Sequence, residues 1–115
     1  MSKIYYLSTC DTCKRIMNQW RLDGVQLQDI KNEPITETQI DEMAALAGST
    51  EALFSKRARK YKELGLKDKT LNDSDIRALI LEEYTFLKRP VLIHDGAIFI
   101  GNSPKVVAAA AAALG

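Results

Sequence analysis

Two cysteines stand three positions apart near the start of the chain, at Cys10 and Cys13, and the sequence contains no others. Residues 3–7 before them are β-branched and aromatic and predict a short buried strand, and a helical pattern follows them. A thiol at the junction of strand and helix lies beside the N–H groups and positive dipole end of that helix, which lower its pKa. The sequence therefore predicts Cys10 as a nucleophilic thiolate.

Cys13 comes one helical turn later, within bridging reach of Cys10 if the two side chains point toward each other. A Cys-x-x-Cys spacing beside a strand–helix–strand pattern is typical of a redox pair, in which Cys13 is the resolving thiol. The alternative is a buried inert thiol, because Cys13 also fits the apolar helix face formed by Ile16, Met17 and Trp20.

A metal site is not expected. A structural zinc site needs about four ligands, and the two cysteines are joined only by His94, the single histidine of the chain. We expect His94 to face solvent or to pack rather than to act in catalysis.

Arg89 and Pro90 could supply a cation near the thiol. The residue before a proline is held extended, which projects the side chain of Arg89 at the entrance of a predicted strand. In thioredoxin-like folds a cis-proline at the start of the third strand faces the redox cysteine. If Pro90 is that residue, Arg89 lies beside Cys10; otherwise Arg89 is a solvated surface charge.

The composition indicates a globular protein. The 115 residues fit one domain, and 46% hydrophobic with 27% charged residues excludes a disordered chain. The formal net charge of +1 gives no bulk attraction for polyanions. No apolar run approaches the roughly 18 residues of a membrane span, and the first residues do not resemble a secretory signal. We expect a soluble, cytoplasmic protein without membrane association.

The elements that must position these residues follow the order β-α-β, three helical segments, then β-β-α. The first helix is expected to end near Gly24, before a strand at 25–30. Two further helices begin at Thr36, where Gln39 completes a capping box, and at Asn72 or Asp73, the latter helix running to Tyr84.

The second half of the chain predicts a hairpin and a last helix. Asp95-Gly96 joins strands at 90–94 and 97–100, and Ser103-Pro104 opens the terminal alanine-rich helix. The fold class predicted is α/β: a thioredoxin-like mixed sheet in a single domain, 1–115, with a helical insertion at roughly 36–84.

A basic run occupies the insertion: Lys56, Arg57, Arg59, Lys60, Lys62, Lys67 and Lys69. It could recognise an anionic substrate, a thiol cofactor such as glutathione or a partner, or it could be a solvated helix face. Direct nucleic-acid binding is not expected, because little aromatic interleaving accompanies the run beyond Tyr61.

Several motifs together resemble the ArsC family: Cys10-Asp-Thr-Cys13-Lys14, Lys-Tyr-Lys-Glu-Leu-Gly-Leu at 60–66, and Lys88-Arg89-Pro90-Val91 with the Asp-Gly hairpin after it. That family groups glutaredoxin-linked arsenate reductases, Spx regulators and YffB-like proteins. The resemblance implies a thioredoxin-like fold, with Cys10 as nucleophile and Arg89 as the oxyanion-binding residue before a cis-proline. It also implies an electron donor, either glutathione with glutaredoxin or thioredoxin. Because metal ligands are lacking, we expect no tightly bound cofactor.

The sequence also departs from the arsenate-reducing members. Ser55 and Asn102 stand where those enzymes have two further arginines. Arg57 matches the arginine of Spx- and YffB-like chains, and Cys13 matches the Spx-like pair that closes a disulfide on oxidation. We predict a thiol oxidoreductase acting on a small oxyanion or thiol substrate, with Thr12, Lys14, Arg57 and Pro90 contributing to substrate binding. The alternative is an Spx-like redox-sensing regulator that binds RNA polymerase.

Overall fold

The computed structural model describes residues 2–115 and forms two compact units. The first unit comprises residues up to Glu33 together with Arg89–Gly115, and the second comprises Pro34–Lys88. The predicted helical insertion, 36–84, falls within the second unit; that the two units make a single domain stays a prediction.

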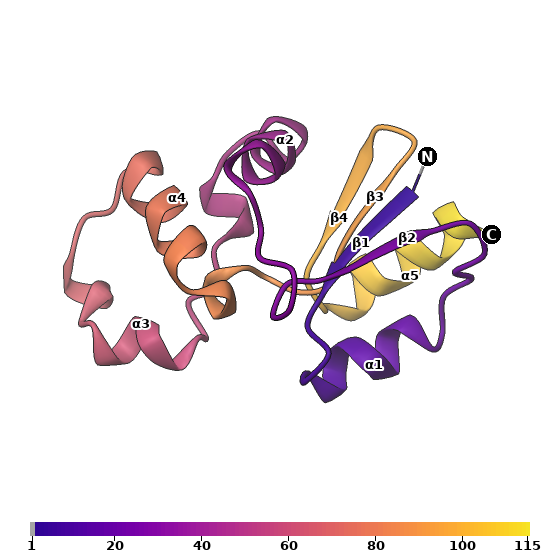
Figure 1. The fold of residues 1–115 in the computed structure, drawn as a ribbon, viewed down its shortest axis with the longest axis horizontal. Helices are drawn as coiled ribbons and strands as arrows, with labels where there is room; N and C mark the ends of the chain where they lie inside the picture. The colour runs from indigo at the N-terminus through magenta and orange to yellow at the C-terminus, as the bar shows by residue number, and fades with distance from the viewer. Residues whose placement is uncertain (1) are drawn as a thin grey trace. The chain divides into compact units, whose positions relative to one another are not determined.

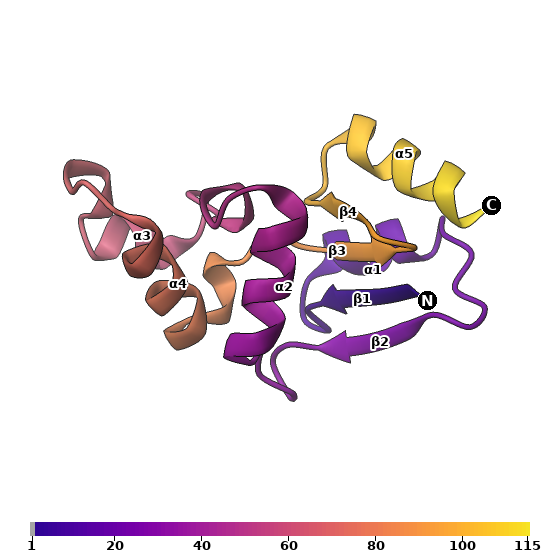
Figure 2. The same ribbon diagram turned by 90° about the horizontal axis from the view of Figure 1, so that it is seen from above.

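The first unit is built on a four-stranded mixed sheet with the order β2-β1-β3-β4 (Figures 1 and 2). The central strand β1 (Ser2–Tyr6) runs parallel to β2 (Gln26–Asp29) and antiparallel to β3 (Val91–His94), which pairs with β4 (Ala97–Ile100). The parallel β1–β2 pair is joined through a helix, as such pairs require. The α/β fold class predicted from the sequence is confirmed.

The predicted hairpin between β3 and β4 turns at Asp95-Gly96. Both residues have positive φ, 48° and 85°, and His94 lies opposite Ala97. Positive φ at both central residues is the geometry of a two-residue hairpin turn, which Asp-Gly favours.

Helices α1 (Asp11–Met17) and α5 (Pro104–Leu114) pack on one face of this sheet. The buried cluster joins side chains of both helices to those of the two central strands: Ile4, Ile16, Met17, Trp20, Leu92 and Ala110. The indole Nε1 of Trp20, in the loop after α1, donates a hydrogen bond to the backbone oxygen of Val107 in α5 at 3.2 Å. The apolar face predicted for the first helix is therefore its core face.

The first helix ends earlier than the sequence indicated. It stops at Met17 with Asn18 as C-cap, and the N–H groups of Gln19 and Trp20 bond to carbonyls three residues back. Gly24, predicted as the cap, instead takes φ 74° in the turn before β2, where Val25 N–H donates to Leu22 O. The difference arises because the apolar pattern continues to Trp20, which is buried without being helical.

The second unit is helical: α2 (Glu37–Ala47), α3 (Arg59–Glu63) and α4 (Asp73–Glu82), with short 3₁₀ turns at Glu51–Leu53, Leu66–Asp68 and Tyr84–Phe86. The capping box of Thr36 and Gln39 and the end of α2 at Gly48 (φ 90°) are as predicted. Asn72, not Asp73, caps α4, through a reciprocal pair of hydrogen bonds with Asp75. Tyr84 lies beyond α4, in a 3₁₀ turn, because the chain turns extended at Glu83.

None of the helices among residues 2–115 combines the length and apolar character needed to cross a membrane.

Candidate active site

The loop between β1 and α1 carries Cys10. Its backbone N–H donates to Leu7 O at 3.0 Å, which closes a tight turn at Ser8-Thr9. The side chain of Asp29, at the end of β2, accepts a hydrogen bond from Ser8 N–H at 3.2 Å. The turn that presents Cys10 is thus held by a hydrogen bond between its two ends and by a second hydrogen bond to the end of β2.

Cys10 is the N-cap residue of α1, with extended φ/ψ of −96° and 109°. Its carbonyl accepts the first helical bond, from Lys14 N–H at 3.2 Å. The side chain makes no capping hydrogen bond by geometric criteria. The backbone N–H of Cys13 nevertheless stabilises the Cys10 thiolate and lowers the pKa of Cys10. The position is the one that the sequence predicted, at the amide end of the first helix.

The environment of Cys10 favours the thiolate. Burial raises the pKa of the Cys10 thiol, but the backbone N–H and the S–H of Cys13 lower it, and so does the Arg89 guanidinium. The net pKa lies below the ordinary value for cysteine. Because Cys10 is only half-buried, its sulfur remains accessible to a substrate.

Cys13 has the opposite environment. Its side chain is fully buried, and burial raises its pKa to about 11, with Cys10 adding to the rise. The N–H of Leu7 and the charge of Arg89 oppose this effect without overcoming it. At neutral pH Cys13 is therefore a neutral S–H group that donates to Cys10.

Arg89 and Pro90 lie at the entrance of β3, joined by a cis peptide bond, as the sequence analysis expected for a thioredoxin-like fold. Pro90 is buried, and its carbonyl accepts from Gly101 N–H at 2.9 Å. Arg89 is half-buried, with Nε inaccessible to solvent, and its charge acts on both cysteines. The structure thus brings Arg89 to Cys10 and does not leave it as a remote surface charge.

Thr12 and Lys14, the neighbours of Cys13, have different surroundings. Thr12 is half-buried in the first turn of α1, and Lys14 is exposed. The backbone N–H of Lys14 donates to the Cys10 carbonyl, so only the exposed ammonium group of Lys14 is available to bind a ligand. The backbone donor facing the sulfur is that of Cys13.

Asp29 is a positioning residue that the sequence reasoning missed. Its carboxylate accepts from the N–H groups of Ser8 and Lys31, both at 3.2 Å, and from Asn32 Nδ2 at 2.7 Å. Slight burial raises the pKa of Asp29, but these donors outweigh it and the pKa lies below its usual range. A polar residue at the end of a strand was the available signal, but its partner in the cysteine turn is distant in sequence.

The remaining predicted positions divide between the units. Arg57 is exposed in the second unit, and so its contribution to substrate binding stays a prediction. Ser55, in the same unit, donates its N–H to Phe86 O. Asn102 is exposed between β4 and α5.

No group of three or more His, Cys, Asp or Glu side chains within residues 2–115 is arranged to hold a metal ion. His94 is half-buried: Nδ1 contacts the hydroxyl of Ser2, and Nε2 lies 3.4 Å from Asp95 Oδ2. It packs at the far end of β3 from Arg89.

The chain belongs to the ArsC family, and the family model matches residues 5–110. The chain is 23% identical over 109 residues to the uncharacterized protein YfgD of Escherichia coli, and the match covers 91% of this chain and 92% of YfgD. It is 25% identical over 93 residues to an arsenate reductase of Yersinia enterocolitica, covering 78% of this chain and 66% of the reductase.

Solved structures show the same fold. A YFFB protein superposes with a TM-score of 0.79 at 23% identity, covering 96% of this chain and 99% of the other. An arsenate reductase from Vibrio cholerae gives a TM-score of 0.78 at 20% identity, covering 94% and 95%. The fold is thus that of ArsC-like proteins.

Proposed function

We propose that this protein is a cytoplasmic thiol oxidoreductase in which Cys10 is the nucleophile and Cys13 the resolving thiol. The observation that carries the proposal is the placement of the two thiols: Cys10 is the half-buried N-cap of α1, and Cys13 is fully buried one helical turn later. These surroundings lower the pKa of Cys10 and raise that of Cys13. A two-step exchange requires one thiolate that attacks the substrate and one protonated thiol that reacts only in the second step.

In the first step the Cys10 thiolate attacks one sulfur of a substrate disulfide. A mixed disulfide forms, and the other half of the substrate leaves as a thiolate that takes a proton from water. Arg89 stabilises the attacking anion beforehand, and the N–H of Cys13 orients it.

In the second step Cys13 loses its proton to solvent and attacks the Cys10 sulfur, which releases the rest of the substrate as a thiolate. The first step prepares this one, because forming the mixed disulfide removes the Cys10 charge that helped to raise the pKa of Cys13. Two thiols of the protein are oxidised to one disulfide, and the substrate disulfide is reduced to two thiols. An external thiol of the glutathione or glutaredoxin class then reduces the protein disulfide by the same exchange.

A disulfide substrate fits better than a free tetrahedral oxyanion. A doubly charged oxyanion needs several charge-assisted contacts. Arg89 supplies one cation at Cys10. The positions that match the two further arginines of the arsenate-reducing members, Ser55 and Asn102, carry neutral side chains.

The test is NADPH consumption with glutathione, glutathione reductase and a small mixed disulfide, with and without added glutaredoxin, and separately with arsenate. Turnover with the disulfide that is abolished in Cys10→Ser supports the proposal. Cys13→Ser should retain the first step and accumulate the mixed disulfide, seen as a mass increase equal to one substrate half.

The regulator alternative predicts a different result. Wild-type protein would then form the Cys10–Cys13 disulfide on mild oxidation, show no turnover with either substrate, and retain a polymerase subunit in pull-down. That combination would refute the oxidoreductase.

A further inference from the structure

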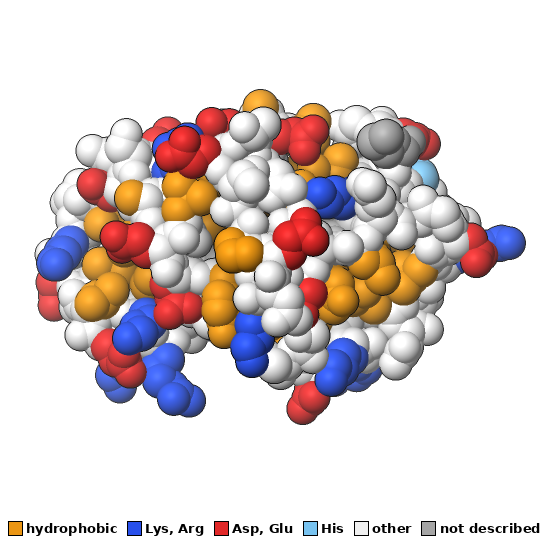
Figure 3. Space-filling view, in the orientation of Figure 1, with side chains coloured by type: hydrophobic (Ala, Val, Ile, Leu, Met, Phe, Trp, Pro, Cys, Tyr) orange, Lys and Arg blue, Asp and Glu red, His pale blue; other side chains and the backbone are white. Residues whose placement is uncertain are grey.

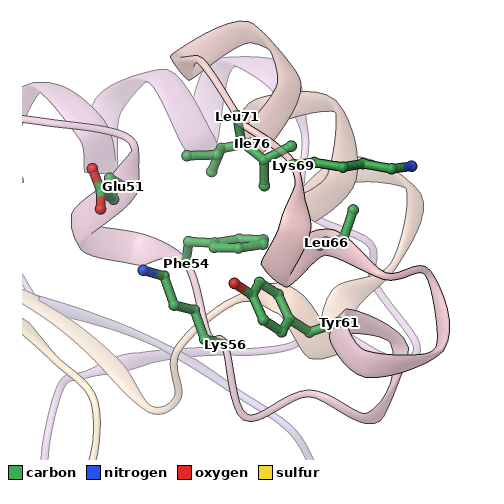
Figure 4. A pocket seen from close by; sticks show the side chains of 8 residues that line it. All are labelled: Glu51, Phe54, Lys56, Tyr61, Leu66, Lys69, Leu71 and Ile76. Atoms are coloured by element: carbon green, nitrogen blue, oxygen red, sulfur yellow. The ribbon is translucent and has the colours of Figure 1, made fainter.

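A pocket of about 160 Å³ lies within the second unit, and neither cysteine nor Arg89 lines it (Figure 4). Its walls come from three separate segments: Phe54 after the first 3₁₀ turn, Tyr61 and Leu66 from α3 and the turn after it, and Ile76 from α4. The volume is close to that of an apolar cavity that accepts benzene. The pocket is therefore of the size that holds one aromatic or branched aliphatic side chain.

Five of the eight side chains that line the pocket are apolar or aromatic, and packing holds these side chains in place. Phe54, Leu66 and Ile76 are each less than 5% exposed. The ring of Phe54 stacks on Phe86 at 5.3 Å and meets the edge of Tyr61 at 5.9 Å. Since this ring cluster also belongs to the core of the unit, the pocket is preformed.

The rim of the pocket is charged. Lys56 and Lys69 line it, both exposed, with exposed Glu51 beside Lys56 (Figure 4). The two lysines begin and end the basic run, which between residues 56 and 69 carries seven Lys and Arg side chains against two acidic ones. All seven are exposed, and basic side chains gather over the α3 segment at the lower left of Figure 3.

We propose that this surface binds an acidic peptide segment of a partner protein, with one aromatic or branched aliphatic side chain of the peptide in the pocket. The apolar and aromatic side chains of the pocket contact the inserted side chain, and the basic run attracts the flanking carboxylates. The positive charge extends well beyond the pocket mouth, which fits an extended anionic partner better than a small anion.

A peptide fits better than a single-stranded nucleic acid. Nucleic-acid grooves present exposed aromatic faces for base stacking, whereas Phe54 is buried against Phe86 and meets Tyr61 edge-on.

The experiment is fluorescence anisotropy with the full chain and a labelled peptide of Asp and Glu residues around one central Phe. The comparison probes are the same peptide with Ala in place of Phe and an oligothymidylate of matched charge. We expect the Ala peptide to bind about tenfold more weakly, because it buries no aromatic ring. The oligothymidylate should bind more weakly than the Phe peptide.

The matched variants are the doubles Lys56→Glu with Lys69→Glu at the pocket, and Lys31→Glu with Lys105→Glu outside residues 34–88. All four lysines are exposed, and both doubles change the net charge equally. The pocket double variant should weaken binding of the Phe peptide by about tenfold or more, and the control double variant should weaken it much less. Equal losses in the two doubles, equal binding of the Ala peptide, tighter binding of the oligothymidylate, or no saturable peptide binding would each overturn the proposal. Cys10→Ser should bind as wild type does, which separates this site from the thiol chemistry.

Discussion

The backbone N–H and the S–H of Cys13 both act on the sulfur of Cys10, one helical turn before it, and the pKa values of the two thiols move in opposite directions. The pair is asymmetric because Cys10 sits at the half-buried end of the helix while Cys13 is sealed in the core. The same spacing in a helix exposed along both positions would not separate the two thiols in this way.

Arg89→Met should slow the alkylation of Cys10 at neutral pH, by roughly tenfold at most, because the cation that lowers the Cys10 pKa is lost. The measurement is the iodoacetamide alkylation rate as a function of pH in a Cys13→Ser background, so that one thiol reacts. Lys14→Met is the matched control, since it removes an exposed cation from the same helix. An equal effect of the two substitutions would contradict a specific role for Arg89.

The buried thiol should make the protein less stable in alkali. The pKa of Cys13 is about 11 in the folded chain, above the ordinary cysteine value of 9.0 that applies when the chain is unfolded. Its contribution is therefore fully present below pH 9 and lost as the pH rises from 9 to 11, by up to about 2–3 kcal/mol. Thermal unfolding across this range should show a steeper loss for wild type than for Cys13→Ala, and parallel curves would be evidence against the buried neutral thiol.

Asp29→Asn should loosen the turn that presents Cys10, because the carboxylate accepts from Ser8, Lys31 and Asn32. The folded pKa of Asp29 is lowered, so its contribution is present above its ordinary value of 3.8 and is lost as the pH falls through the folded pKa. We expect a stability difference of about 1 kcal/mol or less at neutral pH that shrinks in acid, together with slower Cys10 alkylation. Asp23→Asn, in an exposed pair with Arg21, is the control and should leave alkylation unchanged.

The sequence predicts the strands, the capping residues and the hairpin because each depends on neighbouring residues. The capping box depends only on the side chains of Thr36 and Gln39, and the hairpin turn depends only on the ability of Asp95-Gly96 to adopt positive φ. The end of α1 is different: Trp20 continues the apolar pattern beyond the last helical residue, because its place in the core comes from contact with α5.

The site follows the same division. The position of Cys10 at a helix start is readable from local pattern, and the cis bond before Pro90 was inferred from the fold. The Cys-x-x-Cys spacing by itself indicates proximity and not depth. The burial of Cys13, which raises its pKa, agrees with the alternative read from the apolar helix face that it shares with Ile16 and Met17. The role of Asp29 was missed because it depends on β2 ending beside the cysteine turn.

The most direct test of the account is a thiolate titration of the reduced wild-type protein by ultraviolet absorbance, with each step assigned by alkylation and peptide mass. The account predicts two separated steps, Cys10 ionising below the ordinary cysteine value and Cys13 near pH 11. Two thiols that titrate together near 9, or Cys13 ionising before Cys10, would contradict it.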